Sequence, residues 1–134
     1  MKYTILFLLL FISAGCAQTQ LPGFIKWNYD YTYSHINPVD SLKYKMTPED
    51  SLAVEFIVYY SSDSLSWFPL EQTPTKELEH YLLQYRYLYN NLNWYFYSVA
   101  KLGAVESDWS NVIREYFPQL NPDKTYNLRT IMLE

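Results

Sequence analysis

The pattern of apolar and polar residues along the chain predicts several short β-strands. From Gly23 to Asp30 apolar and polar residues alternate, which places Trp27 on the buried face of a strand. The run Leu52–Tyr60 is rich in β-forming residues, and the turn residues after it predict a hairpin with Leu65–Leu70. Because Pro69 cannot donate a backbone hydrogen bond, this second strand is expected to lie at a sheet edge.

A second pair of strands is predicted from the sequence WYFYSVAKLGAVESDWSNVI. Alternate side chains of a strand share a face, so Phe96 and Ala100 are expected in the core, with Tyr95 and Tyr97 on the opposite face. Leu102–Glu106 is predicted to be the loop that leads to the last strand.

Two segments have no single interpretation from their pattern. Residues 77–95 fit a helix, because leucine and tyrosine recur every three or four positions, and they also fit a strand from Leu83 to Tyr87 followed by a turn at Asn90-Asn91. The short strands elsewhere favour the all-β alternative. Thr32–Asp50 has no stable period and is predicted to be a long connection, with a short extended piece at Ser41–Lys45.

The N-terminus has the residue order of an export signal. Lys2 is followed by an apolar run from Ile5 to Ile12 and then by small residues, and this run is too short to span a bilayer as a helix. Ser13-Ala14-Gly15-Cys16 resembles a bacterial lipobox, in which the cysteine is lipidated and becomes the new N-terminus. The alternative is ordinary cleavage that discards Cys16. We therefore expect an exported protein that is lipid-anchored to the bacterial membrane or, alternatively, periplasmic or secreted.

The composition is that of one globular, β-rich domain. A chain of 134 residues suits a single domain, and fifteen tyrosines, seven phenylalanines and four tryptophans against three glycines favour strands. The formal net charge is −4, with no cluster of lysine and arginine, which argues against a nucleic-acid partner. Cys16 is the only cysteine, so no internal disulfide is expected.

The strands together resemble a fibronectin type III domain. Ser107 and Ser110 match the Ser-x-x-Ser element before the family's final strand, and Trp27 matches the core tryptophan of its second strand. Leu88 stands six residues before Trp94, which is the separation between the family's leucine and the tyrosine that bonds back to the backbone at a strand corner. In this chain the indole N–H of Trp94 would replace the tyrosine hydroxyl.

This resemblance implies an all-β fold, an antiparallel two-sheet sandwich of the fibronectin type III, immunoglobulin-like, type. The expected divisions are a signal peptide at 1–15, a tether at 16–22, the fibronectin type III-like domain at 23–115 and a C-terminal extension at 116–134. An obvious first strand is missing between Cys16 and Gly23.

Candidate catalytic and metal-binding residues are sparse. His35 and His80 lack the further ligands of a zinc site and are expected on the surface. Three glycines supply neither a phosphate-binding loop nor a nucleophile elbow, and carboxylates adjacent in sequence do not supply the two facing acids of a glycosidase. We expect no catalytic residues, no metal and no cofactor.

The resemblance instead implies a non-catalytic binding module whose loops, clustered at one end of the sandwich, meet a protein partner. The candidate binding residues are Tyr31, Tyr33, His35, Leu102, Val105 and Glu106. An alternative is a carbohydrate-binding accessory protein that uses exposed tyrosines and tryptophans to stack on sugar rings. A third interpretation is that these aromatics only pair across strands and stabilise the sheet.

Overall fold

The computed structural model describes residues 19–31, 33–36, 43–107 and 109–134, which form an all-β fold with one short helix. The elements in chain order are β1 (Thr19–Trp27), β2 (Tyr33–Ile36), β3 (Lys43–Lys45), α2 (Pro48–Ala53), β4 (Glu55–Ser61), β5 (Phe68–Pro69), β6 (Glu79–Tyr81), the 3-10 turns η1 (Leu82–Gln84) and η2 (Arg86–Leu88), β7 (Leu92–Leu102), β8 (Val105–Glu106), β9 (Ile113–Phe117) and β10 (Tyr126–Leu133).

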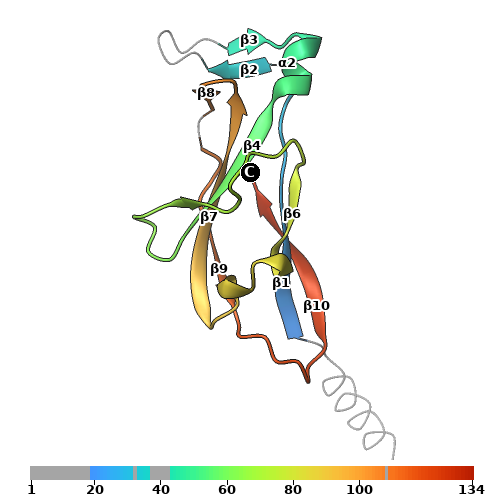
Figure 1. Ribbon diagram of the computed structural model, residues 1–134, viewed down its shortest axis with the longest axis vertical. Helices are drawn as coiled ribbons and strands as arrows, with labels where there is room; N and C mark the ends of the chain where they lie inside the picture. Colours follow the sequence, from blue (N-terminus) through green and yellow to red (C-terminus); the bar gives the residue numbers. More distant parts are fainter. Residues whose placement is uncertain (1–18, 32, 37–42, 108) are drawn as a thin grey trace, which may run out of the picture.

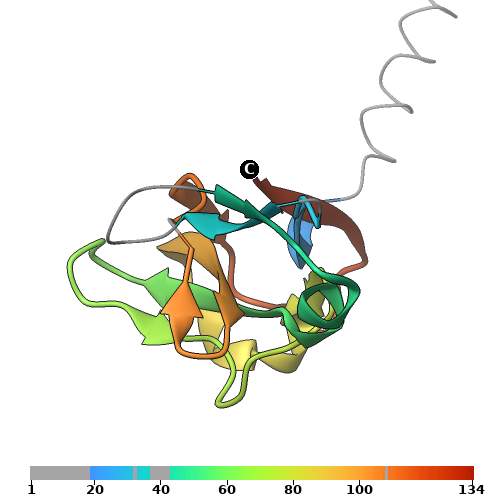
Figure 2. The ribbon, with the colours of Figure 1, turned by 90° about the horizontal axis from the view of Figure 1, so that it is seen from above.

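Two sheets face each other in a β-sandwich (Figure 1). The β1 sheet has the order β10-β1-β6, and the β4 sheet has the order β5-β4-β7-β8, with β9 also paired to β7. Seen from above, β1 and β10 lie across the interior from β4 and β7 (Figure 2). The hairpin of β2 and β3 lies at the end of the sandwich that also carries α2.

The space between the sheets is filled by alternate residues of the strands, as the apolar pattern predicted. The expected core residues Trp27, Phe96 and Ala100 are all buried in one hydrophobic cluster with Phe56, Val58 and Leu88, and Trp94 packs against it half-buried. Trp27 lies against the ring of Phe56 on the facing sheet, with 5.9 Å between ring centroids. The two sheets are therefore joined by a common apolar core.

A side-chain hydrogen bond fixes the corner before β7. Nε1 of Trp94 donates to the backbone carbonyl of Leu88 at 2.7 Å, a bond back to the backbone of the kind that the resemblance implied for this corner. Asn91, with φ of 56°, makes the turn between the two residues, and its side-chain oxygen accepts from the backbone N–H of Gln119. These bonds set the point at which β7 begins.

The C-terminal strand is part of the sandwich and pairs with β1 in parallel. The register runs from Thr19 opposite Tyr126 to Trp27 opposite Leu133. The expectation of a wholly antiparallel sandwich is therefore wrong for this pair. The expected boundaries at 22/23 and 115/116 also differ from the structure, because β1 begins at Thr19 and β10 supplies buried residues to the core.

Gly23 allows β1 and β10 to approach closely. The pairing of the two strands shifts register between Pro22 and Phe24, and a Cβ atom at Gly23 would lie 2.7 Å from Cβ of Leu128. This position needs a residue without a side chain because the neighbouring strand occupies the space.

Three local expectations were wrong. Residues 82–88 form neither the strand nor the long helix considered, but two 3-10 turns. Leu52 belongs to α2, which begins with a capping box formed by Thr47 and Asp50. Leu102–Glu106 is a tight hairpin, because Leu102 pairs with Val105 and Gly103 takes a φ of 61° in the turn. The hairpin of β4 and β5 is confirmed, with Pro69 in the edge strand as expected.

Candidate binding surface

Aromatic side chains gather on the outer face of the β4 sheet. Tyr59 of β4 lies opposite Tyr97 of β7 in the register, and both alternate with residues that point into the core, so they face away from it. Trp67, just before β5, and Trp109, just before β9, add their rings to the same group. We call Tyr59, Trp67, Tyr97 and Trp109 the aromatic surface.

The rings of the aromatic surface pack on one another. Tyr97 stacks on Trp109 with 4.1 Å between centroids and 4° between planes, and on Tyr59 at 5.1 Å and 25°. Trp67 meets Tyr97 edge-on at 4.6 Å. Tyr97 is only 5% exposed in consequence, whereas Trp109 on the outside of the stack is 59% exposed.

Two serines hold Trp109 in place. The backbone N–H of Ser107 donates to the carbonyl of Ala100, and its Oγ accepts from the backbone N–H of Ala100 at 2.9 Å. Ser110 makes the equivalent pair of bonds to the backbone of Ser98, at 2.9 and 2.8 Å. On either side of Trp109, a serine therefore makes the hydrogen bonds to β7 that a paired strand would make. These bonds hold the segment that carries Trp109 against β7.

The surroundings of the aromatic surface carry charges of both signs. Burial, and next the nearby carboxylate of Glu106, raise the pKa of Tyr59 above its ordinary value. Burial, Tyr59 and Glu106 do the same to the pKa of Tyr97, so both phenols keep their protons at neutral pH. On the same face, the guanidinium of Arg114 lies 6.0 Å from the ring centroid of Tyr95, at the limit of a cation–π contact.

The predicted site residues are distributed over different parts of the sandwich. Glu106, in β8, is the one that the structure brings close to the aromatic surface. Val105 is exposed and Leu102 half-buried in the same hairpin. Tyr31 is 38% exposed and lies edge-on to Tyr29 at 5.0 Å.

Tyr33 and His35 belong to β2, whereas a loop was expected there. Cys16, the expected lipidation site, lies outside the described residues.

Trp67 and Trp109 were not among the predicted site residues. The available signal was the outward position of Tyr59 and Tyr97 on neighbouring strands, because rings that bulky on one face attract further aromatic side chains. The burial of Tyr97 could not be read from its strand, since the covering ring belongs to the segment after β8.

A second polar group surrounds His80, which is buried and not on the surface as expected. Its Nδ1 lies 3.3 Å from Oε1 of Glu71, and the Tyr85 hydroxyl donates to that same oxygen at 2.7 Å. The ring of Trp27 packs on the imidazole at 5.2 Å. Burial lowers the pKa of His80 against the opposing effect of the carboxylates of Glu71 and Glu77.

This lowered pKa predicts a loss of stability in mild acid. In the unfolded chain His80 takes up a proton near its ordinary pKa of about 6.5, whereas in the folded state it does so only at lower pH. Below about pH 7 the folded state therefore binds fewer protons than the unfolded state. The free energy of unfolding in urea is therefore expected to decrease between about pH 7 and about pH 5. His80→Gln should flatten this slope. Equal slopes in the parent and His80→Gln would contradict the assignment.

The described residues contain no group of three or more histidine, cysteine, aspartate or glutamate side chains placed to hold a metal ion. None of the helices in the described part of the chain is both long and apolar enough to cross a membrane.

Comparison of the chain with protein-family models, curated proteins and solved structures gives no match.

Proposed function

We propose that this chain is a non-catalytic binding module of the bacterial cell envelope, with a fibronectin type III-like sandwich that meets a protein partner through the aromatic surface. The exported location, with lipidation at Cys16, is part of the proposal and is supported by the N-terminal sequence alone.

Two features support the fibronectin type III-like part of the proposal, and a third departs from the family pattern. Trp94 bonds back to Leu88 as the corner tyrosine of that family does. Ser107 and Ser110 have the spacing of the family's closing element and bond to the strand before it. In the immunoglobulin-like order the first strand pairs with the second; here β10 takes that edge of β1, in parallel, where the sequence lacked a first strand.

The observation that carries the binding proposal is the exposure of Trp109. Tryptophan can bury more surface area than any other side chain, so it is seldom left exposed. Trp109 is nevertheless 59% exposed, with its ring stacked on the buried ring of Tyr97. Tryptophan held rigid by its neighbours loses little entropy on binding, which is why it recurs at the centres of protein interfaces.

The packing of the rings favours a protein over a sugar. A carbohydrate platform requires several open ring faces in a row, but Tyr97 is buried between its neighbours and Trp67 meets it edge-on. Among the four rings of the aromatic surface, Trp109 is the exposed one. Carbohydrate binding therefore stays the alternative function, with the ring of Trp109 as the single stacking platform.

Trp109→Ala separates these functions from a purely structural role. We expect it to weaken capture of an envelope protein by the immobilised domain by at least about tenfold, and to lower the free energy of unfolding by only about 1–3 kcal/mol, the value of its two aromatic pairs with Tyr97 and Trp67. Capture is measured by quantitative mass spectrometry and sugar binding on a glycan array. Met132→Ala, at an exposed site of β10 in the β1 sheet, is the control. If Trp109→Ala captured protein and bound sugars as well as the parent does, both the proposed function and its alternative would be contradicted.

A further inference from the structure

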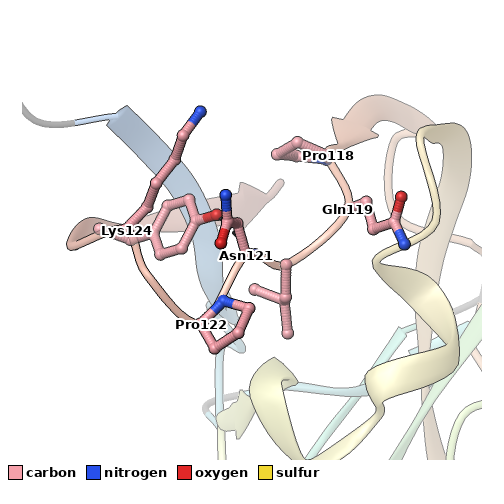
Figure 3. Close-up of a pocket in the computed structure, with 7 residues that line it drawn as sticks. Pro118, Gln119, Asn121, Pro122 and Lys124 are labelled. Carbon is pink, nitrogen blue, oxygen red and sulfur yellow. Dashed lines mark hydrogen bonds between the residues drawn. The ribbon is translucent and has the colours of Figure 1, made fainter.

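An open groove lies at the end of the sandwich where β1 begins, opposite the end that carries α2 and the β2–β3 hairpin (Figure 1). We call it the base groove. It has a volume of about 620 Å³, and the residues that matter for its chemistry are Leu21, Leu83, Arg86, Leu120, Lys124 and Leu128. A neighbouring hollow of about 440 Å³ shares the β9–β10 linker as its wall and is lined by Pro118, Gln119, Asn121 and Pro122 (Figure 3).

The lining of the base groove combines apolar surface with positive charge. Its ionisable residues other than Tyr126 are Arg86 and Lys124, and none of its lining residues is a carboxylate. Both cations are exposed, and neither forms an ion pair with another described residue. Asp123 precedes Lys124 in the linker but is not part of the lining. In a chain with a formal net charge of −4, this end therefore differs from the average surface.

The sequence places the proposed lipid anchor next to this groove. Cys16 stands three residues before Thr19, the first residue of β1, and Leu21 of the same strand lines the groove. Three extended residues reach at most about 11 Å. The anchor therefore lies no farther than this from the start of β1, at the end of the sandwich that carries the groove.

We propose that the base groove docks on the membrane that holds the lipidated Cys16, with Arg86 and Lys124 against anionic phospholipid headgroups. Leucine surface and cations together are what an interfacial contact requires, because the former enters the headgroup boundary and the latter attract anionic lipid. The inference rests on the proposed anchoring. It also gives the domain one orientation, in which the aromatic surface on the outer face of the β4 sheet stays clear of the bilayer.

The test uses the full lipidated protein in vesicles of phosphatidylethanolamine with phosphatidylglycerol. Cys16 is the only cysteine and lipidation consumes its thiol, so Thr125→Cys in the groove lining and Leu65→Cys in the β4–β5 loop each give a single site for a spin label. We expect collisions with a water-soluble nickel complex to be several-fold rarer for the label at 125 than for the label at 65. Equal collision rates would overturn the docking.

Charge reversal tests the role of the two cations. Arg86→Glu with Lys124→Glu should restore the water contact of the label at 125, whereas Lys45→Glu with Lys76→Glu, the same change in net charge elsewhere, should not. Vesicles of phosphatidylcholine alone should act like the reversed variant. Equal effects of the two pairs, or full docking on phosphatidylcholine, would overturn the headgroup contact. Recovery of the protein in the soluble fraction with an unmodified Cys16 would overturn the anchor itself, which is distinguishable from an anchored protein whose groove remains in water.

Discussion

Replacing Trp27 with alanine is expected to lower the free energy of unfolding by about 3–5 kcal/mol, a large part of the stability of a small domain. Trp27 is 2% exposed, joins the two sheets through its contact with Phe56, and packs on His80 of its own sheet. Alanine would leave a cavity that the strands on both sides cannot close. Urea unfolding followed by circular dichroism measures the loss.

Trp27→Phe provides the matched control, because Nε1 of Trp27 is buried without a hydrogen-bond partner among the described residues. Phenylalanine removes that unsatisfied donor and keeps most of the ring, so its cost should be about 1 kcal/mol. A Trp27→Ala variant that melts within a couple of degrees of the parent would contradict the placement of Trp27 at the centre of the core.

Replacing Leu133 with alanine is expected to cost about 2–5 kcal/mol, although the residue lies next to the last position of the chain. Leu133 and Ile131 of β10 are buried in the same cluster as Trp27, and β10 covers one edge of β1 along its whole length. Met132, between these two residues, points outward and is 41% exposed. Met132→Ala should therefore change the free energy of unfolding by no more than about 0.5 kcal/mol.

The pair of variants distinguishes a core strand from a removable extension. If Leu133→Ala and Met132→Ala unfold at the same urea concentration, the inward and outward alternation of β10 is wrong. The same conclusion would follow if a chain that ends at Lys124 unfolded with the stability of the parent.

Local patterns were sufficient to predict the centre of this fold. Alternation placed Phe96 and Ala100 inward on β7, and composition with turn residues gave the hairpin that ends at Pro69. The bond from Trp94 to Leu88 was predictable because it depends on a fixed separation along one chain segment. Contacts between neighbours in sequence leave a signal that a single sequence carries.

Pairings between distant segments left no such signal. Nothing local to Tyr126–Leu133 specifies that it runs parallel to β1, since the partner lies more than a hundred residues away. The leucine and tyrosine spacing of residues 82–88 reflected two 3-10 turns that bury Leu82 and Leu88, which a pattern of three and four positions does not separate from a helix. The capping box of Thr47 and Asp50, in contrast, is a local sequence signal for the start of α2.

The candidate site was predicted only in part for the same reason. Strand alternation predicts outward positions for Tyr59 and Tyr97. The rest of the stack comes from Trp67 and Trp109, which lie in two connecting segments outside the strands, where alternation predicts nothing. Glu106 was predicted in a recognition loop, and it lies instead in a short strand paired to β7.

Photo-cross-linking in cells that produce the protein natively tests the central claim, recognition through the aromatic surface, most directly. A photoreactive phenylalanine at Val112, which is exposed and three residues after Trp109, leaves the stack intact, and the same group at Met132 reports on an exposed site of β10 in the β1 sheet. The account predicts one defined cross-linked partner from position 112, none from position 132, and loss of that product when Trp109→Ala is added. A product from 112 that persists in Trp109→Ala, or a partner captured only from 132, would contradict it.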